Sequence, residues 1–420
     1  MNQTIKTRIE QIGRGEVPDG YKKVKTGVIP EMWRFEKLGK YLVQYHEVTT
    51  QNNQYPVLTS SRRGIFLQSE YYNSEVASDD NTGYNIVPRG YFTYRHMSDD
   101  EIFHFNINDI VDNGIVSTLY PVFTTTDKIN DYFLQTILNE GRDFRRYAIL
   151  QKQGGSRTYM YFEKLKALSL PVPPIEEQEK IAEILGTQDK LVALKEKRIA
   201  EKKQQKKYLM QQLLTGKKRL PGFTDEWKKL KMSEVLTERK EKKGARLLTI
   251  CSVAVSEGVV DQVEHLGKCM AAADTSNYNI VKYGDIVYTK SPTGAFPYGI
   301  VKQSQLNEEV AVSPLYGVYY CEDYNMGYLL NEFFMYPKNT NDYLLPIINK
   351  GAKNTINISN ATFLTPYLYL PKDKEEVKKL AQLFKGLNCE IEFLQKDLEE
   401  EKRKKKALMQ LLLTGIVRVS

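Results

Sequence analysis

Apolar residues near the end of the chain recur at alternating steps of three and four, which is the repeat of an amphipathic helix with one continuous seam. The seam is interrupted at Glu401 and Lys405. Its positions are Val377, Leu380, Phe384, Leu387, Ile391, Leu394, Leu398, Leu408 and Leu412. The pattern predicts a long helix whose apolar stripe needs a partner.

A second stretch, residues 175–214, contains no proline and a single glycine, Gly186. Strong helix formers dominate it, and at 1.5 Å per residue it would reach about 60 Å. Prolines precede it, glutamates fill its first turn, and Thr215-Gly216 ends it. The seam recurs here, 199 residues earlier, at Ile181, Leu185, Val192, Ile199, Leu209 and Leu213. The stretch therefore predicts a second long helix with the same stripe.

The two predicted helices are too long to be covered by blocks of about 150 residues, so we expect them to pair with each other. An antiparallel pair needs no long return connection and is favoured. A parallel pair stays open if the second block supplies that connection, as does packing of each helix on its own block.

The remaining sequence divides into two blocks of mixed α and β character. Short β-rich runs at residues 55–61, 90–95 and 120–126 lie between Gly, Asp and Asn turn residues, and similar runs recur in the second block. Residues 131–139 and 326–335 have helical patterns at matching places.

These recurrences extend over most of the chain. Trp33 aligns with Trp227, and the same shift of 194 residues brings Tyr-Asn-Ile-Val with Gly90 onto Tyr-Asn-Ile-Val with Gly284. The segments LMQQLLTG and LMQLLLTG end the two predicted helices. Two copies of roughly 200 residues predict a pseudo-two-fold molecule.

We therefore predict an α+β fold in which two related mixed α/β globular domains are separated by two long antiparallel coiled-coil helices. The predicted boundaries are residues 1–172 for the first domain, 173–216 for the central helix, 217–371 for the second domain and 372–415 for the distal helix.

Composition and charge add little to this picture. The net charge of +8 is concentrated in the two helical stretches, so it does not by itself indicate that the blocks bind DNA. The four cysteines have no CxxC spacing, and no apolar run has the length of a membrane span or a signal peptide. We expect a cytoplasmic protein with no membrane association.

Motifs for catalysis are missing. The chain has no HExxH, GxxxxGK[ST], GxGxxG or GxSxG pattern, and its four histidines lack metal-pair spacing. Glu238-Arg239-Lys240 matches the tail of a nuclease ExK pattern, but the first half has no copy of it. These observations predict a protein that recognises or connects and is not an enzyme.

The order of elements resembles the specificity subunit of type I restriction-modification systems. The resemblance covers essentially the whole chain and rests on the PxPPxxEQ start at residues 171–178, the duplicated LLTG helix ends and a Trp-containing lead-in to each block. It departs at residues 370–380, where the second helix opens without the double proline and Glu-Gln.

The resemblance implies a non-catalytic DNA reader. Each block would be a target recognition domain for one half of a bipartite double-stranded DNA target, and the helix pair would set the spacing. Two modification (methyltransferase) subunits would dock on the helices and carry S-adenosylmethionine, and restriction (translocase/nuclease) subunits would use ATP and magnesium. This chain alone would hold no cofactor and no metal.

Loops that differ between the two blocks are the candidate DNA contacts, because they combine basic, small polar and glycine residues suited to bases and phosphates. Arg142, Arg145 and Arg146 would at most contact phosphates. In the first block the candidates are Ser60, Ser61, Arg62, Arg63, Arg95, His96, Gly154, Ser156 and Arg157. In the second block they are Lys290, Ser291, Thr293, Lys353 and Asn354.

A coiled-coil scaffold or adaptor that binds two protein partners is the alternative, because it would share the helices and the two-fold layout. A self-contained nuclease or methylase is disfavoured by the missing motifs.

Overall fold

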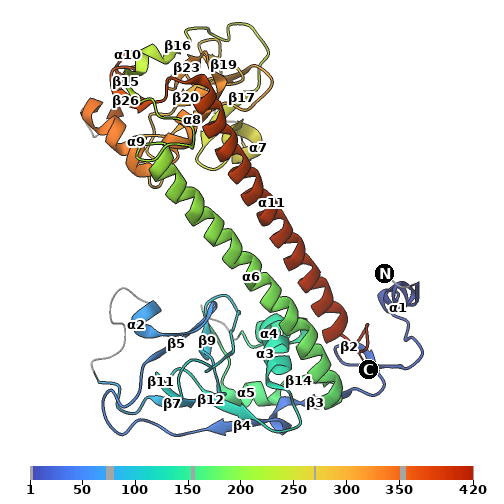
Figure 1. Ribbon diagram of the computed structural model, residues 1–420. Helices are drawn as coiled ribbons and strands as arrows, with labels where there is room; N and C mark the ends of the chain where they lie inside the picture. Colours follow the sequence, from blue (N-terminus) through green and yellow to red (C-terminus); the bar gives the residue numbers. More distant parts are fainter. Residues whose placement is uncertain (1–2, 72–79, 153–156, 269–270, 351–355, 420) are drawn as a thin grey trace. The chain divides into compact units, whose positions relative to one another are not determined.

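The computed structural model describes residues 3–71, 80–152, 157–268, 271–350 and 356–419 (Figure 1). The chain separates into two compact units, called unit 1 and unit 2 below. Unit 1 comprises Met1–Leu194 and Leu398–Ser420, and unit 2 comprises Lys195–Asp397. Each unit therefore combines one globular block with a part of each long helix.

The main sheet of unit 1 has four antiparallel strands in the order β10-β8-β12-β4. Phe92 and Phe123 face each other across β8 and β12, and their rings stack at 4.8 Å. Both rings are fully buried, so they anchor the core of the unit. The strands are β4 (Leu42–Tyr45), β8 (Phe92–Thr93), β10 (Asn106–Ile107) and β12 (Val122–Thr125).

Two further antiparallel strand pairs of unit 1 lie edge to edge. β5 (Leu58–Ser61) pairs with β6 (Gly64–Leu67), and β7 (Asn85–Pro88) pairs with β11 (Asn113–Val116). A parallel bridge between Val57 and Ile115 joins the two pairs.

Short elements complete unit 1. Three strand pairs are β1 (Tyr21–Val24) with β2 (Gly27–Pro30), β3 (Arg34–Lys37) with β14 (Ser169–Val172), and β9 (Met97–Ser98) with β13 (Thr158–Tyr159). The helices are α1 (Gln3–Gly13), η1 (Leu38–Lys40), α2 (Gln68–Tyr71), α3 (Asp131–Glu140), α4 (Arg142–Leu150) and α5 (Phe162–Ala167). Asn130 caps α3 by accepting a hydrogen bond from the backbone N–H of Phe133.

Unit 2 contains the same two sheets. One has the order β16-β23-β20-β21 and the other β18-β17-β22-β19, with β17 and β22 parallel. The strands are β16 (Leu236–Glu238), β17 (Ile250–Ala254), β18 (Gly258–Asp261), β19 (Asn279–Val281), β20 (Ile286–Tyr288), β21 (Val301–Gln303), β22 (Val310–Val312) and β23 (Gly317–Cys321).

Most other elements of unit 2 follow the order of unit 1. The strand pairs are β15 (Lys228–Lys231) with β26 (Tyr367–Leu370), and β24 (Asn349–Lys350) with β25 (Ile356–Asn357). The helices are η2 (Met232–Glu234), α7 (Gln262–Leu266), α8 (Tyr324–Phe334), α9 (Pro337–Leu344), η3 (Leu345–Ile347) and α10 (Asn360–Phe363). One strand pair, β24–β25, and one short helix, η3, have no counterpart among the described elements of unit 1. The matching strand order confirms the internal duplication and the mixed α/β character of both blocks.

The two long helices form where the sequence predicts them. α6 spans Ile175–Leu213 and α11 spans Lys374–Leu413. In unit 1 the first turns of α6 and the last turns of α11 join the core of the block through Ile181, Leu185 and Leu412. In unit 2 the last turns of α6 and the first turns of α11 pack into the core in the same way.

Within each unit the two helices run antiparallel. In unit 2, Lys195 pairs with Asp397 and Lys202 pairs with Glu390. Residue numbers therefore increase along α6 in the direction in which they decrease along α11. In unit 1, Gln188 donates to Glu401, which is one of the two residues that interrupt the seam and is only 7% exposed.

A tryptophan clamp attaches both helices to the block of each unit. In unit 1, Trp33 Nε1 donates to Glu177 at 2.9 Å, and Arg418 forms two hydrogen bonds with the same carboxylate at 2.6 and 2.8 Å. In unit 2, Glu376 accepts from Trp227 at 3.2 Å and from Arg219 at 2.6 Å through two nitrogens. The clamp therefore joins the lead-in of a block, the first turn of one helix and the segment after the other helix.

Candidate nucleic-acid interface

The β5–β6 turn carries four of the predicted DNA contacts. Ser61 accepts a hydrogen bond from the backbone N–H of Arg63 at 3.1 Å, which holds Arg62 and Arg63 at the tip. Arg63 lies over the ring of Tyr71 at 4.6 Å. Ser60 is buried, donates to the carbonyl of Thr93 at 3.3 Å and accepts from Asn106, so its hydroxyl is used inside the fold.

Arg95 and His96 follow β8 at the same end of the main sheet. Arg95 is exposed. His96 Nδ1 lies 2.6 Å from the carbonyl oxygen of Leu119, and its ring stacks on Tyr161 at 5.1 Å. Tyr161 stacks in turn on Tyr159 at 5.8 Å and is 52% exposed. The predicted pair thus borders a partly exposed row of three rings.

Three consecutive acidic residues meet the basic residues of this surface. Nη2 of Arg62 lies 2.6 Å from both carboxylate oxygens of Asp100, and Nε of Arg157 lies 2.9 Å from Asp99. Lys152 forms an ion pair with Glu101. Arg62, Lys152 and Arg157 therefore pair with three consecutive carboxylates, residues 99–101, called the acidic run below.

A cavity of about 220 Å³ brings these segments together in unit 1. The wall combines the β5–β6 turn, the segment after β8 and part of the acidic run. Its lining residues are Thr59, Ser60, Ser61, Arg62, Arg95, Met97, Ser98, Asp99, Ile102, Phe103, His104 and Tyr120. Four of the predicted contacts therefore line one concave surface with hydrogen-bond donors and acceptors.

The ion pairs of the acidic run are open to solvent. The side chains of Arg62 and Asp100 are 58% and 46% exposed, and those of Arg157 and Asp99 are 49% and 65% exposed. The Arg62 guanidinium holds the pKa of the Asp100 carboxyl below its ordinary value. Exposed pairs of this kind contribute about 0 to 1 kcal/mol to stability. Losing them should therefore change the unfolding free energy of unit 1 very little.

Arg142, Arg145 and Arg146 lie on α4. Arg142 and Arg145 line a separate cavity of about 530 Å³ beside the last turns of α11, together with Lys405 and Lys406. This cavity does not contain the predicted loop contacts of unit 1.

Unit 2 places its predicted contacts after β20. Lys290 is half-buried and donates to Asn360 at 3.2 Å, and burial lowers the pKa of its ammonium group. Ser291 and Thr293 are exposed in a turn that closes through two backbone hydrogen bonds between Thr293 and Phe296. The four predicted residues Gly154, Ser156, Lys353 and Asn354 lie outside the described part of the chain.

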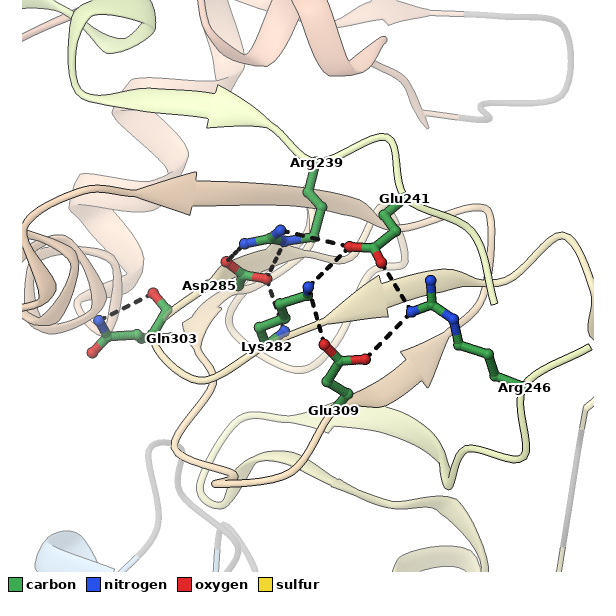
Figure 2. Close-up of polar contacts among 8 residues, drawn as sticks. Arg239, Glu241, Arg246, Lys282, Asp285, Gln303 and Glu309 are labelled. Atoms are coloured by element: carbon green, nitrogen blue, oxygen red, sulfur yellow. Dashed lines mark hydrogen bonds and ion pairs between the residues drawn. The ribbon is translucent and has the colours of Figure 1, made fainter. Parts of the chain in front are cut away.

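At the other end of β20, an ion-pair network joins the two sheets of unit 2 (Figure 2). Arg239, just after β16, binds both carboxylate oxygens of Asp285 at 2.6 and 2.8 Å. Lys282, just after β19, lies 3.1 Å from Glu241 and 3.0 Å from Glu309. Arg246 contacts the same two glutamates. Because Asp285 precedes β20 and Lys290 follows it, this network is separate from the predicted loop.

The sequence Glu238-Arg239-Lys240, which matches the end of a nuclease ExK pattern, uses its first two side chains in contacts within the fold. Glu238 accepts a hydrogen bond from Asn360 at 2.8 Å, and Arg239 is committed to Asp285. Within the described ranges, no group of three or more His, Cys, Asp or Glu side chains could hold a metal ion. None of the described helices is both long and apolar enough to cross a membrane.

Sequence reasoning missed the acidic run and the tyrosines at 159 and 161. The run is visible in the sequence as Asp99-Asp100-Glu101 directly after the divergent segment that contains Arg95. A count of acidic neighbours beside the predicted cations would have found it. The two tyrosines gave no comparable signal, because 28 tyrosines are spread over the chain.

Known proteins share both sequence and fold with this chain. Residues 35–204 match the family model of the type I restriction modification DNA specificity domain. The type I restriction enzyme MjaVIII specificity subunit of Methanocaldococcus jannaschii is 27% identical over 288 residues, which are 61% of this chain and 63% of that protein. A second protein of that organism, provisionally named the type I restriction enzyme MjaX specificity subunit, is 23% identical and covers 96% of this chain and 97% of its own length.

Two solved structures have the same fold. The S subunit of a type I restriction-modification system from M. genitalium has a TM-score of 0.54 at 11% identity, covering 90% of this chain and 96% of that one. A chain from a study of complex assembly and conformational transition of the type I R-M system has a TM-score of 0.53 at 14% identity, covering 93% and 99%. Residues 35–204 thus match the type I restriction modification DNA specificity domain, and over most of its length the chain is similar in sequence to a specificity subunit and in fold to an S subunit.

Proposed function

We propose that this chain is the non-catalytic DNA-reading subunit of a type I restriction-modification complex. Each globular block reads one half of a bipartite target, and the antiparallel pair of α6 and α11 separates the two readers and docks two modification subunits. In this proposal S-adenosylmethionine, ATP and magnesium bind the partner modification and restriction subunits, and this chain holds none of them.

The observation that carries the proposal is one framework with two unlike loop sets. The strand order of the main sheet is the same in both units, yet the segment after β8 presents Arg95 and His96 where the segment after β20 has half-buried Lys290 followed by exposed Ser291 and Thr293. Arginine can bind guanine through two hydrogen bonds, whereas threonine and lysine offer different donors. Two unlike readers on related scaffolds suit a target whose halves differ.

The direct test is a map of adenine methylation in host cells with and without the gene. We expect a split sequence, with two short specified halves and an unspecified gap, to be methylated only when the gene is present. Methylation that does not depend on the gene, or a single unsplit motif, would contradict the proposal.

A second test separates the two readers. Arg62→Ala with Arg63→Ala should weaken binding at one half-site and leave the other preference intact, and Ser291→Ala with Thr293→Ala should affect only the other half. Equal loss for every sequence, with only the salt dependence changed, would make these residues phosphate contacts. Failure of the chain to shift any duplex, alone or with its methyltransferase partner, would favour the scaffold alternative.

A further inference from the structure

The second residue that interrupts the seam of α11, Lys405, forms a polar site in unit 1. Its ammonium group pairs with Asp189 of α6. The other carboxylate oxygen of Asp189 accepts a hydrogen bond from the hydroxyl of Tyr132 on α3. One site thus connects both long helices with the helix that packs on the main sheet.

Unit 2 contains a matching site. Lys206 of α6 donates to Asn388 of α11 at 2.6 Å, and Asn388 donates to the hydroxyl of Tyr328 on α8 at 2.7 Å. Lys206 also lies 2.7 Å from Glu332, whose side chain is 3% exposed. Again a lysine of one helix meets a polar side chain of the other helix and a tyrosine of the block.

The two sites are copies of one arrangement. The shift of 199 residues that aligns the helix ends also aligns Lys206 with Lys405 and Asp189 with Asn388. A shift of 196 aligns Tyr132 with Tyr328. In unit 2 the negative charge comes from Glu332 because Asn388 has none. The arrangement therefore recurs although the acidic group has moved to a different helix.

The apolar seam alone does not select one axial register. Its positions are mostly Leu, Ile or Val at seven-residue intervals, so a slip of one heptad, about 10 Å, would replace many apolar contacts with other apolar contacts. The same slip would separate Lys405 from Asp189 and Lys206 from its partners. Partly buried charges would then have no counter-charge, which is strongly unfavourable. A polar residue in an otherwise apolar seam is a known way to fix register at some cost in stability.

The tryptophan clamp adds a second fixed point to each helix. Glu177 precedes Asp189 by 12 residues, and Glu376 precedes Asn388 by 12 residues. Twelve helical residues span about 18 Å, so the clamp and the lysine site hold each unit's helix segments at two well-separated positions. Neither helix segment can slide without breaking both.

We propose that Lys405 with Asp189, and Lys206 with Asn388, are positioning residues that fix the axial register of α6 against α11. This inference rests on the proposed function, because that register then sets the distance between the two DNA readers. A single register permits one gap length between the half-sites, and a relaxed register permits other lengths.

The test uses disulfide trapping in the full chain, with the exposed Cys389 changed to serine. Gln188 and Glu401 are in contact, so Gln188→Cys with Glu401→Cys reports the observed register. Gln188→Cys with Leu408→Cys or with Leu394→Cys reports a slip of one heptad in either direction. With the lysine sites intact, we expect a disulfide only in the first pair.

Substitutions then act on the lysine sites of both units. Tyr132→Phe, Asp189→Leu and Lys405→Met together make the site of unit 1 apolar without leaving an unpaired charge, and Lys206→Met, Glu332→Gln and Asn388→Leu do the same in unit 2. Both sets are introduced into a chain whose clamps are opened by Glu177→Gln and Glu376→Gln. We expect slipped disulfides to appear when both sites are apolar, while the melting temperature does not fall below that of the chain with opened clamps alone. Asp189→Lys with Lys405→Asp keeps an ion pair with its charges exchanged and should restore the single register. This exchange is the matched control for loss of packing.

The DNA readout uses duplexes whose mapped half-sites are separated by different gaps. The apolar variant should bind gaps about three base pairs longer or shorter within several-fold of the native one, because a slip of about 10 Å equals about three steps of 3.4 Å. The wild type should prefer one gap. An unchanged disulfide pattern in the apolar variant would overturn the inference, whatever the DNA result. If the wild type bound no half-site pair at all, the proposed function would fail while the disulfide pattern still decided the register.

Discussion

The two units meet the same structural need with different chemistry at one pair of positions. In unit 1, the rings of Tyr45 and Tyr91 pack edge to face at 5.0 Å between the end of β4 and the start of β8. In unit 2, the shift of 194 residues places Arg239 and Asp285 there, and they form a two-bonded ion pair. The position requires a contact between two strands and accepts either an aromatic or an ionic one.

The attachment of the long helices tolerates less change. Both clamps use Trp, Glu and Arg. Both lysine sites, around Lys405 in unit 1 and Lys206 in unit 2, use a lysine and a tyrosine. These sites join three separate elements, so each side chain must suit two partners at once. Within this chain, residue identity is kept at the clamps and at the lysine and tyrosine of the two lysine sites, whereas it changes at the sheet positions 45/239 and 91/285.

The largest effect is expected from breaking the ion pair of unit 2. Asp285→Ala leaves Arg239, whose side chain is 17% exposed, without its carboxylate, so unit 2 should lose about 3 to 5 kcal/mol of unfolding free energy. Arg239→Tyr with Asp285→Tyr copies the contact of unit 1 and should recover most of that loss. Urea unfolding followed by hydrogen exchange in unit 2 measures both.

Glu309→Ala is the control for Asp285→Ala, because Glu309 belongs to the same network but its side chain is 42% exposed. Its loss should cost less than about 1 kcal/mol. If Arg239→Tyr with Asp285→Tyr destabilised unit 2 as much as Asp285→Ala does, the aromatic contact could not replace the ion pair.

The tryptophan clamps should differ in strength. Glu376→Ala should cost unit 2 about 3 kcal/mol, because it removes the carboxylate that accepts from Arg219 and from the Trp227 indole at a site where that carboxylate is 1% exposed. Of its hydrogen bonds, Arg219 then keeps the one to the Asp225 carbonyl. Glu177→Ala should cost unit 1 less, about 2 kcal/mol, since Arg418 is 34% exposed and water can solvate it. Glu176→Ala and Glu375→Ala, at exposed neighbouring positions, are the controls, and equal losses in both units would refute the ranking.

A third difference concerns Lys302, which is 4% exposed in unit 2. Burial lowers the pKa of its ammonium group to about 8, below the value of an unfolded chain. Between pH 8 and about 10.5 the unfolded state therefore binds more protons, so the stability of unit 2 should rise with pH in that window. Lys302→Met removes the penalty and should stabilise unit 2 by about 2 kcal/mol at pH 7, with little gain near pH 10.

The measurement is the urea midpoint of wild type and Lys302→Met at both pH values. Lys338→Met is the control, because Lys338 is exposed and pairs with Asp342. A gain that did not shrink as pH rose would show that the lysine is not the cause.

The periodic features of this chain could be predicted from the sequence. Residues 175–214 predicted α6 within one residue of its end, because a long run of helix formers with a regular seam has few alternatives. The duplication predicted matching blocks, and the strand order agrees. Local patterns do not determine how strands order themselves in a sheet, so the parallel contact between β17 and β22 could not be predicted.

The candidate site was only partly predictable, because its contacts join residues far apart in the chain. Arg62 and Asp100 are 38 positions apart, so the sequence shows a basic turn and an acidic run but not their pairing. Ser60 looked like a loop residue, yet it lies on the inner side of β5 and is buried. Lys405 was visible as an interruption of the seam, while its partner on the other helix was not.

The smallest effect in free energy concerns the acidic run, which unit 1 has and which the matching segment Thr293-Gly294-Ala295 of unit 2 lacks. Asp99→Asn with Asp100→Asn should free Arg62 and Arg157 for phosphates, because both pairs are exposed and hold little stability. We expect several-fold tighter binding to random-sequence duplex at low salt. The salt dependence should steepen by roughly one to two units, since each phosphate contact releases about one counterion.

Asp109→Asn with Asp112→Asn is the matched control, because both residues are exposed in unit 1, the pair changes the net charge equally, and Asp112 binds Arg89 away from the cavity. If the control tightened binding as much, the effect would come from net charge and not from release of the two arginines. Tighter binding to random-sequence duplex with an unchanged affinity for the target would mean that the acidic run improves discrimination between target and other DNA. Every DNA sequence would then have to displace an internal carboxylate before it can bind Arg62 and Arg157.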